Sequence, residues 1–145
     1  MPDFRPLMTV FATPALLLLA GCERPTPQVT VFSGPRSDHV EATCWSAEGA
    51  RATPEDCQVK AERVGSLTIA PGDTIGISVD QAAAEDGGWM PTIGDARLVP
   101  KPLTSTYHRF QLSERDLAAG QLELRIYAVD GEATRGLWVF RLRGR

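Results

Sequence analysis

Short runs in which apolar and polar side chains alternate dominate residues 29–145. This period of two is typical of strands that bury one face, because successive side chains of a strand point to opposite faces. In the cleanest run, Leu122, Leu124 and Ile126 alternate with charged or hydroxyl-bearing side chains. The same alternation predicts further strands, whose inward sets are Val29/Val31, Val40/Ala42/Cys44, Leu67/Ile69, Ile75/Ile77/Val79, His108/Phe110/Leu112 and Trp138/Phe140/Leu142.

Glycine and proline residues separate these runs and predict tight connections. Residues 70–73 (Ala-Pro-Gly-Asp) have proline and glycine where a type II turn prefers them. Ser113 and Asp116 have the spacing of a capping box, which predicts a helical turn over Ser113–Leu117, and a second short helix is expected within Gln81–Gly88. Many short strands with one or two helical turns predict an all-β fold. The expected architecture is an antiparallel immunoglobulin-like β-sandwich, with a small β-barrel as the alternative.

Residues 1–21 have the pattern of an export signal. Arg5 precedes an apolar stretch over Phe11–Ala20, which is about half of the roughly 20 apolar residues that a membrane-spanning helix needs. The stretch ends in Leu-Ala-Gly-Cys, a lipobox, which predicts that Cys22 is lipidated and becomes the first residue of the mature protein. An ordinary secretory signal cut near Ala20-Gly21 and an uncleaved anchor are the alternatives.

Lipidation of Cys22 would hold the mature chain on a membrane, because two acyl chains anchor a protein stably whereas one binds only marginally. Residues 22–28 form a polar, proline-bearing linker, which at about 3 Å per residue keeps the domain within roughly 20 Å of the bilayer. The predicted organisation is a signal peptide at 1–21, the lipidated cysteine and linker at 22–28, and a β-sandwich at 29–145. The predicted location is the outer face of the cytoplasmic membrane.

The chain has three cysteines, and Cys22 is assigned to the lipid. Cys44 and Cys57 remain, and the compartment outside the membrane is oxidising. A Cys44–Cys57 disulfide is therefore predicted, which could contribute about 3 kcal/mol to stability. The alternative of a metal or redox pair lacks C-x-x-C spacing and neighbouring histidines.

The composition offers little catalytic or metal-binding chemistry. The net charge is −3 without a basic block, which argues against a nucleic-acid partner. The histidines are His39 and His108, and no nucleophile motif such as G-x-S-x-G occurs. Neither histidine has the spacing of a metal ligand relative to the other or to Met90. We therefore expect a protein that is not an enzyme and that uses no cofactor and no metal.

The three tryptophans are the candidates for a contact surface. Alternation places Trp138 in the core, and Trp45 is expected to pack over the disulfide. Trp89 follows two glycines in an expected loop, so Trp89, Met90 and Pro91 are the candidate contact surface if exposed. A buried packing role for Trp89 is equally compatible with the sequence.

Several motifs follow one another along the mature chain, namely Glu23–Pro27, Glu41–Cys44, Pro71–Asp80, Gly88-Trp89, Thr106-Tyr107 and Gly136–Leu142. In this order and spacing the chain resembles an actinobacterial family of exported lipoproteins that is catalogued only as a domain of unknown function (DUF2771-like). The resemblance implies a signal, a lipidated cysteine and an exported domain. It implies no activity, cofactor or catalytic residue.

Together these observations predict a membrane-tethered extracytoplasmic lipoprotein that acts as a non-enzymatic interaction module of the cell envelope. Its expected partners are the membrane, through the lipid on Cys22, and an envelope protein or a cell-wall polymer. The alternative function is an envelope small-ligand carrier or metal chaperone.

Overall fold

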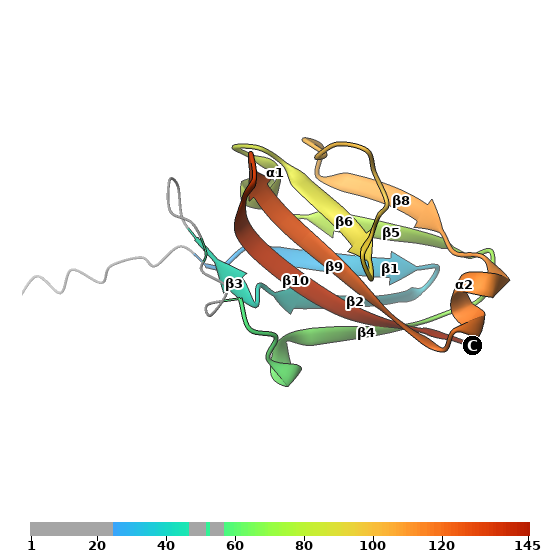
Figure 1. Ribbon diagram of the computed structural model, residues 1–145. Helices are drawn as coiled ribbons and strands as arrows, with labels where there is room; N and C mark the ends of the chain where they lie inside the picture. Colours follow the sequence, from blue (N-terminus) through green and yellow to red (C-terminus); the bar gives the residue numbers. More distant parts are fainter. Residues whose placement is uncertain (1–24, 47–51, 53–56) are drawn as a thin grey trace, which may run out of the picture.

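Two sheets packed face to face make up the computed structural model, which describes residues 25–46, 52 and 57–145. The four-stranded sheet has the order β2 (Arg36–Glu41), β1 (Gln28–Ser33), β5 (Thr74–Val79) and β8 (Tyr107–Gln111). The six-stranded sheet has the order β3 (Cys44–Trp45), β10 (Ala133–Gly144), β9 (Gln121–Asp130), β6 (Trp89–Ile93) and β7 (Ala96–Arg97), and β4 (Val64–Ile69) also pairs with β10. Figure 1 shows β10, β9 and β6 in one layer and β1, β5 and β8 in the other. The predicted all-β sandwich is confirmed, and the alternative of a barrel is wrong.

The order of the strands from β5 onward is that of an immunoglobulin-like sandwich. β5 pairs with β8 in one sheet, and β9 lies between β6 and β10 in the other. These are the positions of strands B and E and of strands C, F and G in immunoglobulin domains. The β1–β2 hairpin extends the first sheet on the other side of β5. β4 runs parallel to β10, whereas the other pairings between described strands are antiparallel.

The core lies between the sheets, where the alternating runs of the sequence meet. β10 turns Trp138, Phe140 and Leu142 inward, and all three are fully buried. Strands of both sheets contribute a set of fully buried aliphatic side chains: Val29, Val31, Ile75 and Ile77 from the four-stranded sheet, and Ile69, Leu124 and Ile126 from the six-stranded sheet. The predicted inward faces of these strands are therefore confirmed.

Two short α-helices and a 3₁₀ turn connect the strands: α1 (Gln81–Ala84), α2 (Glu114–Ala118) and η1 (Ala61–Arg63). Ser113 caps α2, because its hydroxyl accepts from the backbone N–H of Asp116 while the Asp116 carboxylate accepts from the backbone N–H of Ser113. This is the predicted capping box, and the helix expected within Gln81–Gly88 is also present.

One predicted strand divides between the two sheets. The run Val40/Ala42/Cys44 alternates as a single strand would, but β2 ends at Glu41 and the chain then crosses to β10. There the backbone N–H of Thr43 donates to the carbonyl oxygen of Leu137 (2.7 Å) and that of Ser46 donates to the carbonyl oxygen of Arg135 (2.8 Å). Ala42 and Cys44 are buried on this path too, so alternation alone could not reveal the change of sheet.

The two ends of the sandwich carry different parts of the chain (Figure 1). We call the end with Pro27, β3 and α1 the linker end, and the end with α2, the turn at 70–73 and Arg145 the far end. The predicted signal peptide at 1–21 and the lipidation site Cys22 lie outside the described residues. Over the described ranges, none of the helices has the length and apolar character that would let it span a bilayer.

Candidate functional site

Trp89 is a core residue. It opens β6 opposite Ala128, so that its side chain points between the sheets and is fully buried. Its indole N–H donates to the carbonyl oxygen of Ser105 at 2.7 Å. Pro91 is also buried and Met90 is half-buried. Of the two alternatives open for Trp89, the buried packing role is the one observed, and Trp89, Met90 and Pro91 do not form an exposed contact surface.

The glycines before Trp89 explain this burial. Gly87-Gly88 has the composition of an exposed loop, but both residues pass close to other backbone segments. A Cβ on Gly87 would lie 2.3 Å from the carbonyl oxygen of Val129, and one on Gly88 would lie 2.3 Å from that of Leu103. The glycines thus serve a close approach that brings Trp89 into the core.

The predicted disulfide between Cys44 and Cys57 is confirmed, with the Cα atoms 4.8 Å apart. It joins β3 to the chain that leads into η1 and packs with Leu137 and Val139 on the outer face of the six-stranded sheet. Trp45 points the other way and packs against Trp138, so it does not cover the disulfide as expected. A disulfide suggests an extracytoplasmic domain, because such bonds persist in oxidising compartments.

The histidines do not converge on a site. His39 is exposed on β2, whereas His108 is half-buried on β8 with its ring edge-on to Trp89. In the part of the chain that the structure describes, no group of three or more His, Cys, Asp or Glu side chains could hold a metal ion.

Three of the surface hollows that the described residues line lie at the ends of the sandwich. Two adjoin at the far end, with volumes of about 540 and 500 Å³, and both are lined by Pro71 and Glu114. The third, of about 430 Å³, lies at the linker end beside Thr43, Trp45 and Arg63. Neither His108 nor Met90 lines any of the three. The hydroxyl of Thr43 is buried without a hydrogen-bond partner among the described residues.

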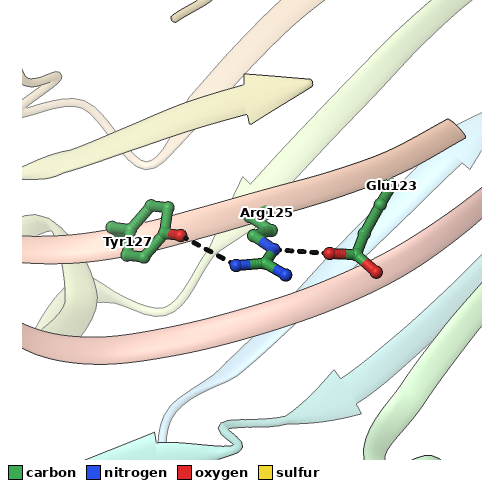
Figure 2. A network of polar contacts seen from close by, with 3 residues as sticks. All are labelled: Glu123, Arg125 and Tyr127. Atoms are coloured by element: carbon green, nitrogen blue, oxygen red, sulfur yellow. Dashed lines mark hydrogen bonds and ion pairs between the residues drawn. The ribbon is translucent and has the colours of Figure 1, made fainter. Parts of the chain in front are cut away.

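Beside the apolar cluster at the disulfide, the outer face of the six-stranded sheet carries a polar network along β9. Figure 2 shows Arg125 between Glu123 and Tyr127 along β9, where its guanidinium donates to the Glu123 carboxylate and to the Tyr127 hydroxyl. These two partners, the Tyr127 hydroxyl first, raise the pKa of Arg125 above its ordinary value. Arg141 stands opposite Glu123 on β10. Because Glu123 and Arg125 already pair with each other, this network offers little unpaired charge to a ligand.

The outer face of the four-stranded sheet carries a stacked aromatic pair, of which Tyr107 is exposed and Phe32 half-buried. Phe32 on β1 and Tyr107 on β8 stack with their ring centroids 6.0 Å apart and their planes 14° from parallel. The Phe32 ring lies across Gly76 of β5, where a Cβ would meet the ring at 2.3 Å. Tyr107 is 47% exposed, the most of any large hydrophobic side chain in the described residues. Glycine in the middle strand thus makes room for an apolar surface that reaches the edge of the sheet.

β8 is also an open edge, since it pairs with β5 on one side and with no described strand on the other. The carbonyl oxygens of Thr106 and Leu112 accept from Val79 and Gly72 on the β5 side. Backbone groups alternate direction along an antiparallel strand, so those of Tyr107, Arg109 and Gln111 point away from β5. We call Phe32, Tyr107, Arg109 and Gln111 together the β8 surface.

Sequence reasoning missed this surface, although a signal was present. Tyr107 and Arg109 have the outward parity of their strand, and Gly76 is the only outward glycine of the run Thr74–Val79.

No family model, curated protein or solved structure matches the chain.

Proposed function

We propose that this protein is a lipid-anchored extracytoplasmic lipoprotein that acts as a non-enzymatic interaction module of the cell envelope. Its contact surface is the β8 surface, and its partner is an envelope protein or a cell-wall polymer. The observation that carries the proposal is that Tyr107, the most exposed large hydrophobic side chain of the described residues, lies on the open edge of a sheet. Exposed aromatic side chains and unpaired sheet edges are both features that binding partners cover.

The arrangement of the domain supports the proposed tether. The chain enters the sandwich at the linker end, where the indole N–H of Trp138 donates to the carbonyl oxygen of Pro27 at 2.9 Å. β8 begins at this end and runs toward the far end (Figure 1). A lipid on Cys22 would therefore hold the linker end next to the bilayer. The β8 surface would then lie on the lateral side of the domain, accessible to a partner. The disulfide supports the extracytoplasmic part of the proposal.

The alternative of a small-ligand carrier or metal chaperone has less support. Such a function needs a pocket where His108 or Met90 meets other polar groups. His108 instead packs edge-on against buried Trp89, and the three hollows described above lie elsewhere. The resemblance to the exported lipoprotein family remains a prediction, and it supports the location without adding an activity.

Labelling and crosslinking in the native host test the two parts of the proposal. An alkyne fatty acid should label the wild-type protein and leave the Cys22→Ala variant unlabelled, and the variant should leave the membrane fraction. A photo-crosslinking amino acid in place of Tyr107 should then give a discrete adduct with one envelope protein or with wall polymer. The matched control carries the same amino acid in place of Arg141, which is exposed on the opposite face of the sandwich.

Each part of the proposal can fail separately. Equal labelling of wild type and the Cys22→Ala variant would reject the lipid anchor. Identical adduct patterns from positions 107 and 141, or none from position 107, would reject the β8 surface as the contact site.

A further inference from the structure

The edge of β8 presents main-chain groups in the arrangement that strand addition requires. The backbone N–H groups of Tyr107, Arg109 and Gln111 and the carbonyl oxygens of Arg109 and Gln111 point away from β5, as the alternation of the ladder dictates. The carbonyl oxygen of Tyr107 already accepts from the Ser105 hydroxyl at 3.0 Å, which leaves the stretch from Tyr107 N–H to Gln111 free to pair.

The edges of two other described strands, β2 and β6, are covered, in contrast to the edge of β8. The edge of β2 lies beside β4, where the Asp38 carboxylate accepts from the backbone N–H of Ser66 at 2.8 Å. β6 is covered by the two-residue strand β7. β8 carries none of the usual devices that prevent pairing at an edge: it contains no proline and no bulge, and Arg109 is its one formally charged residue.

We propose that an extended segment of a partner protein adds to β8 as a further strand of the four-stranded sheet. This inference rests on the proposed function and names its partner class and binding mode. Main-chain hydrogen bonds would supply affinity, and side chains opposite Tyr107 and Arg109 would supply selectivity. Arg109 is exposed and has no ion pair among the described residues, so the segment carries an acidic side chain opposite it. A side chain two positions further along then packs on the Phe32–Tyr107 pair.

A second copy of the chain fits this edge poorly. Two copies of β8 related by a two-fold axis pair antiparallel, which turns the linker end of one copy toward the far end of the other. β10 has 12 residues, and at about 3.3 Å per residue the sandwich is roughly 40 Å long. With the strands perpendicular to the membrane, a linker of roughly 20 Å cannot bring both copies back to one bilayer. The geometry of the tether therefore favours a partner with a free extended segment.

Defined peptides test strand addition on the purified full chain in detergent. The probe is a capped nine-residue peptide of alternating threonine and valine with a central glutamate. One matched control has lysine at the centre, and a second is methylated on the backbone nitrogen of the glutamate so that it cannot donate. We expect the glutamate peptide to bind about tenfold more tightly than the lysine peptide, because opposite charges replace like charges across the strand pair. The methylated peptide should not bind.

Variants and hydrogen exchange locate the binding. Arg109→Glu should reverse the preference between the glutamate and lysine peptides. Arg109→Pro should abolish binding of both while the domain stays folded, because the N–H it removes is not part of the β5–β8 ladder. The amides of Tyr107, Arg109 and Gln111 should exchange at least about tenfold more slowly with the glutamate peptide bound.

Three results would overturn the inference: equal affinity for the methylated and unmethylated peptides, protection of amides outside β8, or no binding by any peptide. Dimers in sedimentation that Arg109→Pro abolishes would assign the edge to a second copy. Binding of purified wall polymer that is lost in Tyr107→Ala, without peptide binding, would assign the surface to a glycan. These last two results would reject the peptide partner while leaving the β8 surface as a contact site. If the photo-crosslinking amino acid at position 107 gives no adduct in the native host, the proposed function itself is rejected.

Discussion

The indole N–H of Trp138 and the carbonyl oxygen of Pro27 form a buried hydrogen bond of 2.9 Å across 111 positions of the chain. Trp138 is central to β10 and fully buried, whereas Pro27 is the last residue before β1. The bond therefore fixes where the predicted linker leaves the core. It also determines which end of the sandwich a lipid on Cys22 would bring to the membrane.

Replacing Trp138 tests this attachment. Trp138→Phe leaves the Pro27 carbonyl oxygen buried without a donor and opens a cavity beside Phe140, so we expect the free energy of unfolding to fall by about 2–3 kcal/mol in urea denaturation. Trp45→Phe is the matched control, because Trp45 is half-buried and should cost about 1 kcal/mol or less. Equal losses in the two variants would show that the bond to Pro27 adds nothing.

Arg135 is a buried cation that ties α1 to β10, and its loss should be costly. Its guanidinium donates to the carbonyl oxygens of Glu85 (2.7 Å) and Ala82 (3.3 Å) and lies 4.9 Å from the centre of the Trp45 ring. Arg135→Met removes both hydrogen bonds and leaves the Glu85 carbonyl oxygen with the backbone N–H of Gly88 (3.2 Å) as its remaining donor, so we expect the free energy of unfolding to fall by about 2–4 kcal/mol in urea. Arg141→Met, on the exposed face of the same strand, should change it by no more than about 0.5 kcal/mol. Comparable effects of the two changes would contradict the assigned role.

Gly65 and Gly76 both make room for an aromatic ring, but only one of the two rings has space to move aside. A Cβ would meet the Phe140 ring at 2.3 Å from Gly65 and the Phe32 ring at 2.3 Å from Gly76. Phe140 is fully buried and cannot move aside, whereas Phe32 is half-buried on the outer face and can turn toward solvent. We expect Gly65→Ala to cost about 2–3 kcal/mol of unfolding free energy and Gly76→Ala about 1 kcal/mol.

The Gly76→Ala variant also reports on the β8 surface. Its near-ultraviolet circular dichroism should change as the Phe32–Tyr107 stack separates, and peptide binding should weaken. A Phe32→Ala change in the Gly76→Ala background should recover stability, because it removes the clash. Failure of that second change to recover stability would show that the ring is not what excludes a side chain at position 76.

The capping box of α2 predicts a local pH dependence. Hydrogen bonds from the Ser113 hydroxyl (2.6 Å) and backbone N–H (2.9 Å), together with the charge of Arg115, hold the pKa of Asp116 below its ordinary value of 3.8. A depressed pKa in the folded state means that the stabilisation is present above pH 3.8 and is lost as the pH falls through the lower folded value. The start of α2 should therefore fray only at strongly acidic pH.

Side-chain carboxyl shifts in an NMR titration check this prediction. Ser113→Ala should move the pKa of Asp116 back toward 3.8, because it removes the largest contribution to the shift. Asp116→Asn should remove the pH dependence of the α2 amide signals. An Asp116 that titrates at its ordinary pKa in the wild-type protein would contradict the observed cap.

Local patterns predicted those parts of the fold that depend on near neighbours. The alternation of Leu122, Leu124 and Ile126 identified the inward face of β9, and Ser113 with Asp116 identified the start of α2. The pairing of Cys44 with Cys57 followed from elimination in an oxidising compartment. Each inference needed only side-chain parity, a cap over three positions or the count of cysteines.

The candidate site depended on relationships that no local pattern contains. Gly87-Gly88 has the composition of a loop tip, but the close approach of Val129 and Leu103 makes it the entry to a buried strand, which removes Trp89 from the surface. Tyr107 lies on the last described strand of its sheet, and that position follows from the order of the strands, which the sequence of β8 alone does not contain.

The sequence by itself determined which segments extend, which of their faces is apolar and which cysteines pair. Only the tertiary structure decided that β4 lies parallel to β10, that one alternating run divides between β2 and β3, and that β8 is left with an open edge. The physical reason is that alternation specifies two faces for a strand but not its neighbours. The neighbours of a strand are set by backbone hydrogen bonds between segments far apart in the chain. These bonds have the same donors and acceptors whatever the side chain, so the sequence pattern does not reveal them.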